Sequence, residues 1–231
     1  MDEPRTNVSD AALRTIASHC AVAGLCPLIP IPFVDELIVE RIHRSMNASL
    51  CEQHDIKLLA LSSKLLAESE SDLLNGALKG LLMWPLKKLL RKMLFVLAIK
   101  NCVDVATEVF HEGWLLARAL EEGYADLEEM KKNKPSTLRT LRHAIVMARE
   151  EIDPDMTRQV MRSAFEMSSE VFTDLVSSVR KAMTGAGDGE KLDAAAKSAA
   201  PLTARLEDAL REQWSRGEAL DAALRDAIAR A

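Results

Sequence analysis

A chain of 231 residues is long enough to bury a full hydrophobic core in one domain, or in one domain with an appendage. Good helix formers dominate, aromatic residues make up only 4% of the chain, and runs of β-branched residues are few. The composition therefore favours an all-α fold, and the acidic start MDEPRTNVSD, which has no apolar run behind a basic stretch, is not expected to be a secretory signal.

The first predicted helix is capped by Asn7 or Ser9 and runs to Gly24. The apolar segment CPLIPIP should then be extended, because residues that precede proline avoid the α region. Pro32 suits the first turn of a second helix, residues 33–53, with Asp35 near its positive end.

Residues 15–34 are uncharged and are long enough to cross a bilayer as a helix. Gly24, Pro27, Pro30 and Pro32 break such a helix, and freed backbone groups are costly in lipid. The favoured interpretation is a buried helix followed by an extended connector. A re-entrant hairpin covered by protein is the alternative.

Further helices follow, each with a start signal in the sequence. Asp55 can cap residues 55–68, Ser71 or Asp72 can cap residues 72–83, and Pro85 can start or kink a long central helix to about Met130. Beyond the NKPS turn, Pro135 opens a helix that includes residues 137–151, and the DPD sequence at 153–155 caps one helix over residues 156–183.

Three glycines in the segment TGAGDGE mark the clearest linker of the chain. We therefore expect a helical domain over residues 8–184, a Gly-rich linker at 185–189 and an amphipathic helical tail at 190–231. The tail either folds back on the body or projects from it. The fold class that this predicts is an all-α helical bundle with one long central helix.

Residues 73–103 contain six cations and neither Asp nor Glu, although the whole chain has a net charge of −5. The remainder of the chain thus carries about −11, an asymmetry that points to binding partners and not to fold. On a helical wheel at roughly 100° per residue, the cations from Lys87 to Lys92 occupy one face and the neighbouring leucines and Met93 the other. This pattern is typical of helices that lie on anionic lipid.

Beyond Ile99 the two faces exchange. Asp104, Glu108 and Glu112 fall on the side that carried the leucines, and Val103 and Phe110 fall on the side that carried the cations. A straight helix cannot turn both apolar faces to one core, so it must either bend or find a second apolar partner for its first half. A membrane, a second subunit or a second layer of the same domain would serve, whereas in an ordinary bundle the lysines would be a solvated edge. Nucleic acid is disfavoured, because no aromatic residues interleave with the cations.

Two Glu-x-x-His pairs, Glu40 with His43 and Glu108 with His111, resemble the pairs of ferritin-like di-metal sites. Glu40 and His43 fall opposite the apolar stripe of their helix, and the first helix contains no bridging glutamate. We expect a solvated polar face and neither a metal nor a cofactor. His19, on an apolar stretch, should be a satisfied core histidine.

No other pattern in the chain indicates a reaction. The sequence has no P-loop, no G-x-G-x-x-G fingerprint and no G-x-S-x-G setting for its serines. The four cysteines have neither C-x-x-C nor zinc spacing and should be buried free thiols of a reducing cytosol. The protein is therefore not expected to be an enzyme, and no catalytic residue is assigned.

The stretch GLCPLIPIPFVDELIVERIHRSMNASLCEQHDIKLL resembles the opening of a bacterial family of membrane-associated helical domains. That family includes the domains appended to Era-like GTPases and the YcjF-type inner-membrane proteins, and EcsC proteins look related in style. The resemblance covers about residues 15–120 and rests on Pro30, Pro32, Phe33 and Asp35 followed by a helix and a polar loop. It implies a membrane role, with a GTPase or a transporter component as the class of protein partner, and no catalytic residues.

The chain departs from this family in its later helix, which carries Lys100, Asp104, Glu108 and Glu112 in place of small apolar residues. Peripheral attachment at the cytoplasmic face of the inner membrane is therefore expected in place of integral insertion. The alternative is a soluble interaction module or homo-oligomer. The predicted lipid-binding cations are Lys79, Lys87, Lys88, Arg91 and Lys92, and the predicted apolar docking residues are Leu82, Trp84, Leu86, Leu89, Leu90 and Met93.

Overall fold

The computed structural model of the protein describes residues 8–28, 35–67, 90–167, 169–185, 190–213 and 217–231. These residues form eleven α-helices and no strand, which confirms the predicted all-α bundle. The predicted helix over residues 72–83 lies outside the described residues. The helices are α1 (Asp10–Leu25), α2 (Asp35–Glu52), α3 (Ala60–Ala67), α4 (Leu90–Glu121), α5 (Leu127–Lys131), α6 (Pro135–Glu150), α7 (Asp155–Phe165), α8 (Ser169–Gly185), α9 (Glu190–Ser198), α10 (Ala200–Gln213) and α11 (Gly217–Arg230), with a 3-10 turn, η1 (Cys26–Leu28), after α1.

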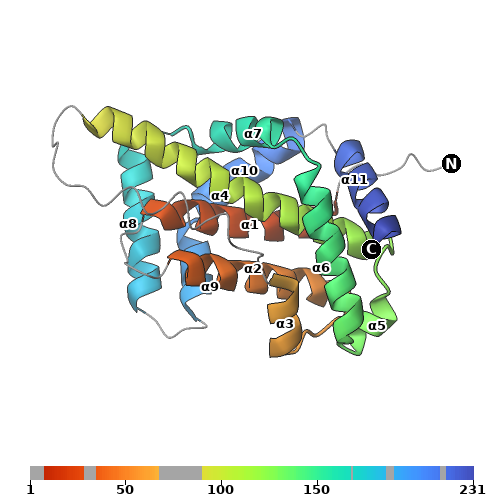
Figure 1. Cartoon of the computed structure of the whole chain (residues 1–231). Coiled ribbons are helices and arrows are strands. Elements are labelled where there is room, and N and C mark those ends of the chain that lie inside the picture. Colours follow the sequence, from red (N-terminus) through yellow and green to blue (C-terminus); the bar gives the residue numbers. More distant parts are fainter. Residues whose placement is uncertain (1–7, 29–34, 68–89, 168, 186–189, 214–216) are drawn as a thin grey trace.

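The centre of the bundle is the packing of α1 along α4, the long helix that the sequence predicts (Figure 1). Ser9 caps α1 by accepting a hydrogen bond from the Ala12 amide. Small residues let the two backbones approach: a Cβ atom on Gly24 would overlap the Phe165 ring and lie 3.0 Å from the Cys102 carbonyl oxygen. From Cys102 onward α4 is therefore a core element.

The central helix ends earlier than predicted. It stops at Glu121, and Gly123 turns the chain with a φ of +69° before the separate short helix α5 begins after its cap, Asp126. A positive φ is strained for most side chains but not for glycine, which explains the break within the predicted helix to Met130.

The connection between α2 and α3 also differs from the prediction. Asp55 has a φ of 59° in a tight turn and does not cap a helix, and α3 begins only at Ala60. Residues 57–59 are instead held by Asn133, whose side-chain amide donates to the Lys57 carbonyl at 3.0 Å and accepts from the Leu59 amide at 2.9 Å. A polar residue of a distant turn therefore replaces the local cap.

The single helix predicted over residues 156–183 is two helices, α7 and α8, although neither glycine nor proline separates them. Arg205 of α10 explains the break. Its guanidinium donates to the carbonyl oxygens of Ala164 at 2.9 Å, Ser163 at 3.2 Å and Glu166 at 2.9 Å. The last carbonyls of α7 are thus satisfied by a tertiary contact, so the helix can end there without a local stop signal.

The helices that follow residue 190 pack on the body and do not project. Here α9 lies against α8, α10 against α1 and α7, and α11 against α6 and α4. Buried Arg118 of α4 pairs with Asp221 of α11 at 3.1 Å, and the Tyr124 hydroxyl donates to the same carboxylate at 3.2 Å. Tail leucines such as Leu206 and Leu224 are fully buried in the common core.

Among the described residues, the stretch Asp10–Leu28 is long and apolar enough to cross a bilayer by length and composition. However, 61% of its most apolar window is buried inside the bundle, as in the core helix of a globular protein. The first helix of the uncharged stretch is therefore a buried helix, and residues 29–34 of the connector fall outside the described part of the chain.

Candidate functional site

Most of the predicted docking residues lie outside the described residues. This holds for Lys79, Lys87, Lys88, Leu82, Trp84, Leu86 and Leu89. Leu90, Arg91, Lys92 and Met93 form the first turn of α4, of which the backbone alone is described. The side of this turn that meets solvent is therefore not decided, and the predicted docking set stays a prediction.

The path of α4 bears on that prediction. At ~1.5 Å per residue its 32 residues span about 48 Å, more than the ~30 Å diameter of a small domain. Every residue from Val109 to Leu120 is buried, whereas the yellow N-terminal turns of α4 extend past the ends of α1 and α7 (Figure 1). The helix thus has an enclosed half and a projecting half.

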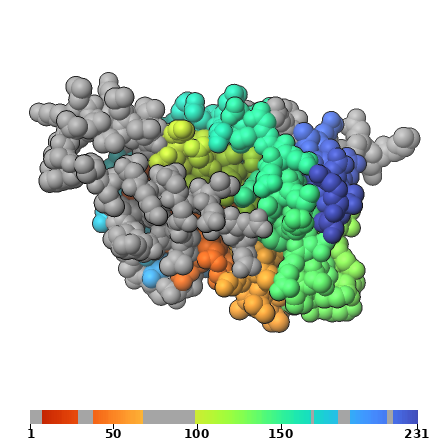
Figure 2. All heavy atoms as spheres, in the orientation of Figure 1, coloured from red at the N-terminus to blue at the C-terminus, as the bar shows by residue number. Residues whose placement is uncertain are grey.

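The acidic face of α4 beyond Ile99 packs against arginines of α6 and α7, with Asp104 and Glu108 partly exposed and Glu112 buried. Figure 2 shows α6 and α7 beside the one visible strip of α4. Asp104 pairs with Arg158 at 2.9 Å, and Glu108 pairs with Arg149 at 3.0 Å. The Glu112 carboxylate forms ion pairs with the guanidinium groups of Arg149 at 2.8 Å and Arg142 at 3.1 Å.

Glu112 is the centre of this charged cluster because it also contacts His43 of α2 through an Nδ1–Oε2 ion pair of 2.7 Å. Burial alone would raise the pKa of Glu112, but His43 and the two arginines hold it well below its usual range. Burial would likewise lower the pKa of His43, yet the charge and hydrogen bond of Glu112 raise it above its ordinary value. The contact therefore favours the charged form of both groups.

These contacts correct the prediction that the two Glu-x-x-His pairs lie on solvated faces. His43, His111 and Glu112 are buried, with 6%, 3% and 4% of their surface exposed. Glu40 of the first pair is half-buried and pairs with Arg44 of its own helix. The faces were misread because the partners of Glu108 and His111, which are Arg149 and Thr157, lie 41 and 46 residues further along the chain, and the partner of His43 is on α4.

His111 has a different environment from His43. Its Nε2 atom lies 2.8 Å from the Thr157 hydroxyl oxygen of α7. Burial, reinforced by the charges of Arg149 and Arg158, lowers its pKa to about 4. The two histidines thus do not meet, and within the described residues no three His, Cys, Asp or Glu side chains are close enough to hold a metal ion.

The four cysteines are buried and form no disulfide, as predicted. Burial raises the pKa of the Cys51 and Cys102 thiols to about 12 and that of Cys20 further. Such thiols are protonated at neutral pH and are inert as nucleophiles or metal ligands.

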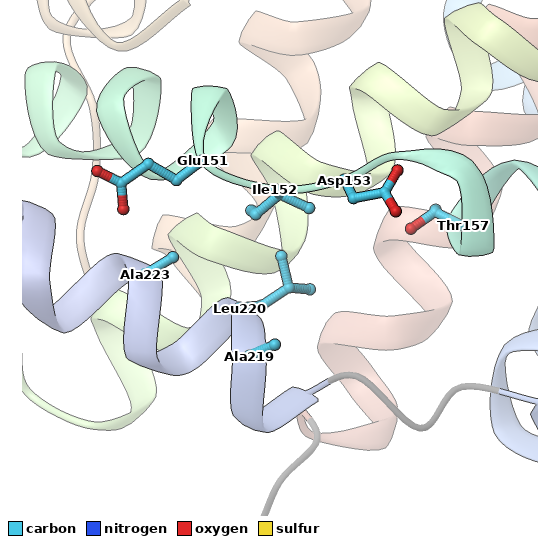
Figure 3. A pocket seen from close by; sticks show the side chains of 7 residues that line it. All are labelled: Glu151, Ile152, Asp153, Thr157, Ala219, Leu220 and Ala223. Carbon is cyan, nitrogen blue, oxygen red and sulfur yellow. The ribbon is translucent and has the colours of Figure 1, made fainter.

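Two hollows over the described residues are candidate sites. The smaller, about 180 Å³, lies between the α6–α7 connection and α11, with Ile152 and Leu220 across from each other (Figure 3). Its acidic groups already have partners, since Glu151 pairs with Arg230 at 2.6 Å and Asp153 accepts from the Asp155 amide at 3.0 Å. The larger, about 290 Å³, is a groove between α1, α2 and α9.

The exposed large apolar side chains of the described residues are few. Leu59 and Leu61, around the start of α3, are 65% and 67% exposed, and Val171 of α8 is 54% exposed. Leu59 and Leu61 lie together next to Lys57 and Lys64, which are also exposed. Sequence periodicity did not single them out, because the predicted helix started five residues too early.

Comparison of the chain with family models, with characterised proteins and with solved structures finds no match. The resemblance to membrane-associated helical domains therefore stays a prediction from the residues that carry it.

Proposed function

We propose that this protein is a non-enzymatic adaptor that docks on the anionic cytoplasmic face of a membrane through residues 73–99 and holds a protein partner there. The observation that carries the proposal is the projecting half of α4, which extends beyond the described body (Figure 1). That half begins inside the segment with six cations and no acid. A basic, apolar helix end that leaves the bundle is suited to a lipid surface.

The ion pairs of α4 strengthen this proposal. Asp104, Glu108 and Glu112 are the acids of this helix nearest to the basic segment, and all three are paired with residues of α6, α7 or α2. These three acids are therefore already neutralised by partners in the body. Anionic headgroups are then the counter-charges that we propose for the upstream cations.

The energy needed is modest. Each lysine or arginine near an anionic leaflet contributes about 1 kcal/mol, so four or five cations give reversible attachment. In this proposal the headgroups are met by Lys79, Lys87, Lys88, Arg91 and Lys92, and the interface is entered by Leu82, Trp84, Leu86, Leu89, Leu90 and Met93.

An adaptor also needs a second surface for its partner. Leu59 and Leu61 provide an exposed apolar pair around the start of α3, which lies at the opposite edge of the body from the yellow start of α4 (Figure 1). A partner on α3 would leave the basic segment free to meet lipid. A GTPase or a transporter component remains the partner class that the family resemblance implies.

Liposome flotation tests the docking. The protein should float with vesicles that contain phosphatidylserine, but not with pure phosphatidylcholine vesicles, and salt should weaken the binding because it screens the charges. The double variant Lys87→Glu with Arg91→Glu should remain in the bottom fraction.

The matched control is Lys57→Glu with Lys64→Glu, which makes the same change of charge on two exposed lysines of the body. It should float like the unchanged protein. Equal loss in both double variants would show only a dependence on net charge. If the protein binds neither vesicle type and forms dimers in sedimentation equilibrium, the membrane proposal is wrong and the protein is a homo-oligomer.

A further inference from the structure

The groove between α1, α2 and α9 is polar at one end and apolar at the other. Each helix contributes one stripe of side chains: Arg14, Thr15, Ser18, His19 and Val22 from α1, Ile42, Ser45 and Ser49 from α2, and Leu192, Asp193 and Ala196 from α9. Its volume of about 290 Å³ is at the lower end of the range for small-ligand sites. At ~30 Å³ for each water-sized group, it holds roughly ten non-hydrogen atoms.

Contacts between α1 and α2 order the groove along its length. Gln53 donates to the Thr15 hydroxyl oxygen at 2.9 Å, and Ser45 lies 3.3 Å from His19 one turn further along α1. The two helices therefore run antiparallel, so that Arg14, Thr15 and Ser49 share one end. Val22 and Ile42 share the other.

His19 lies between the two ends of the groove and is uncharged. Its Nδ1 atom lies 2.7 Å from the Thr15 carbonyl oxygen and must donate to it, which leaves Nε2 to accept from the Ser45 hydroxyl. Burial lowers the pKa of His19 despite the hydrogen bond to Thr15 and the charge of Asp193, which act in the opposite direction. The imidazole is thus uncharged at neutral pH, and Arg14 is the cation of the groove.

Arg14 is available to a ligand. Its side chain is 69% exposed, and its contact with Glu207 is a long one at 3.9 Å. Glu207 also pairs with Arg211 at 3.3 Å, so it keeps a partner when Arg14 binds elsewhere. The serine hydroxyls of the polar end can add hydrogen bonds to an anion held by the guanidinium.

We propose that this groove binds a medium-chain carboxylate, with the carboxylate at Arg14 and the alkyl chain along Val22, Ile42 and Leu192. The hydroxyls of Ser18 and Ser49 flank the carboxylate, and the chain passes the neutral imidazole of His19. Asp193 also lines the groove and its negative charge acts on His19, so the anion is held at Arg14. The proposal does not rest on membrane docking.

Isothermal titration calorimetry of the full chain with octanoate, below its micelle concentration, tests the site. We expect one saturable site for octanoate, with at least tenfold weaker binding of octanol, which lacks the charge, and of acetate, which lacks the chain. Octanol that binds as tightly as octanoate would overturn the proposal, as would the absence of saturable binding.

Three variants locate the site. Arg14→Gln should weaken octanoate binding roughly tenfold, the loss expected for one charge-assisted hydrogen-bonding partner. Ala196→Leu should narrow the groove, which Ala196 lines, and weaken octanoate binding as well. Arg211→Gln is the matched control, because Arg211 also pairs with Glu207 but does not line the groove, and it should bind octanoate unchanged.

Once octanoate binding is observed, each variant tests where octanoate binds. Equal effects of Arg14→Gln and Arg211→Gln would place octanoate elsewhere, and unchanged affinity in Ala196→Leu would remove the alkyl chain from the groove. Either result overturns the proposal. All three positions are exposed or half-buried, so thermal melts of the variants should match that of the parent protein.

Discussion

The two halves of α4 differ in what surrounds them. From Val109 to Leu120 every residue of the helix is buried, and Glu112 is paired with arginines and a histidine of the body. At its start, Leu90, the same helix extends beyond the ends of α1 and α7 (Figure 1). Polarity along one helix therefore does not reveal which face meets water, because a charged face can be internal where another element supplies counter-charges.

The largest effect should come from removing the charge at the centre of the enclosed half. Glu112→Gln would leave His43, Arg142 and Arg149 without their shared carboxylate, and breaking a buried ion pair costs about 3–5 kcal/mol. Urea unfolding would measure this loss as a lower free energy of unfolding.

The control for that change is Glu108→Gln on the same helix. Glu108 is 28% exposed and shares Arg149 with Glu112, so its loss should cost less than about 1 kcal/mol. If the two variants were equally stable, the cluster would be a surface feature and the enclosed half would not depend on it.

The next largest effect should be an acid-side loss of stability caused by His111. Its pKa is about 4 in the folded protein and near 6.5 in the unfolded chain, so the unfolded state binds the proton first as the pH falls. Stability should therefore decrease between pH 6.5 and pH 4, by about 3 kcal/mol for this group.

His43 has the opposite sign and does not add to that loss. Because its folded pKa is raised, its contribution is complete below the unfolded pKa and is lost only as the pH rises through the folded value. His19, whose pKa is lowered, acts in the same direction as His111. Urea titrations of His111→Asn across this range should show a flatter pH dependence than the parent protein; an unchanged slope would contradict the assignment.

A smaller effect is expected where α4 leaves the body. In Gly24→Ala the new methyl group would meet the Phe165 ring and the backbone oxygen of Cys102, neither of which can move freely, so a cost of about 2 kcal/mol is expected. In Gly113→Ala the nearest atom is the Met46 sulfur at 2.7 Å, at the end of a flexible side chain. Thermal melts should therefore show the larger loss for Gly24→Ala, and the reverse order would show that α1 and α4 do not approach most closely there.

Local signals in the sequence were enough for much of the fold. Ser9 and Pro135 mark helix starts that the structure has at the same places, and the 3.6-residue periodicity identified the apolar stripe of α2 around Ile42 and Met46. Contacts between residues far apart in the chain were not predictable in this way. Arg205 ends α7 from about 40 residues away, and no local residue signals that end.

The same limit applies to the candidate sites. A helical wheel of α4 places Glu108 and Glu112 on one face but cannot show that α6 covers it. The spacing of the charges gave no signal either, since Arg142 and Arg149 are seven residues apart on α6 whereas Glu108 and Glu112 are four apart on α4. Side chains of three helices line the groove at His19, and its serines belong to no sequence motif. The groove was therefore not predictable from the sequence.

The smallest effect on stability, with a large effect on binding, should come from Lys100→Glu. Lys100 is exposed, is the last cation of the basic segment and lies where α4 passes from its projecting to its enclosed half. An exposed charge change should alter the free energy of unfolding by less than about 0.5 kcal/mol. At about 1 kcal/mol for each cation near an anionic leaflet, reversal of the charge should weaken vesicle binding roughly tenfold or more, because attraction is replaced by repulsion. Flotation against Lys64→Glu, an exposed lysine on α3, provides the comparison, and equal binding of the two variants would mean that the end of α4 does not approach the membrane.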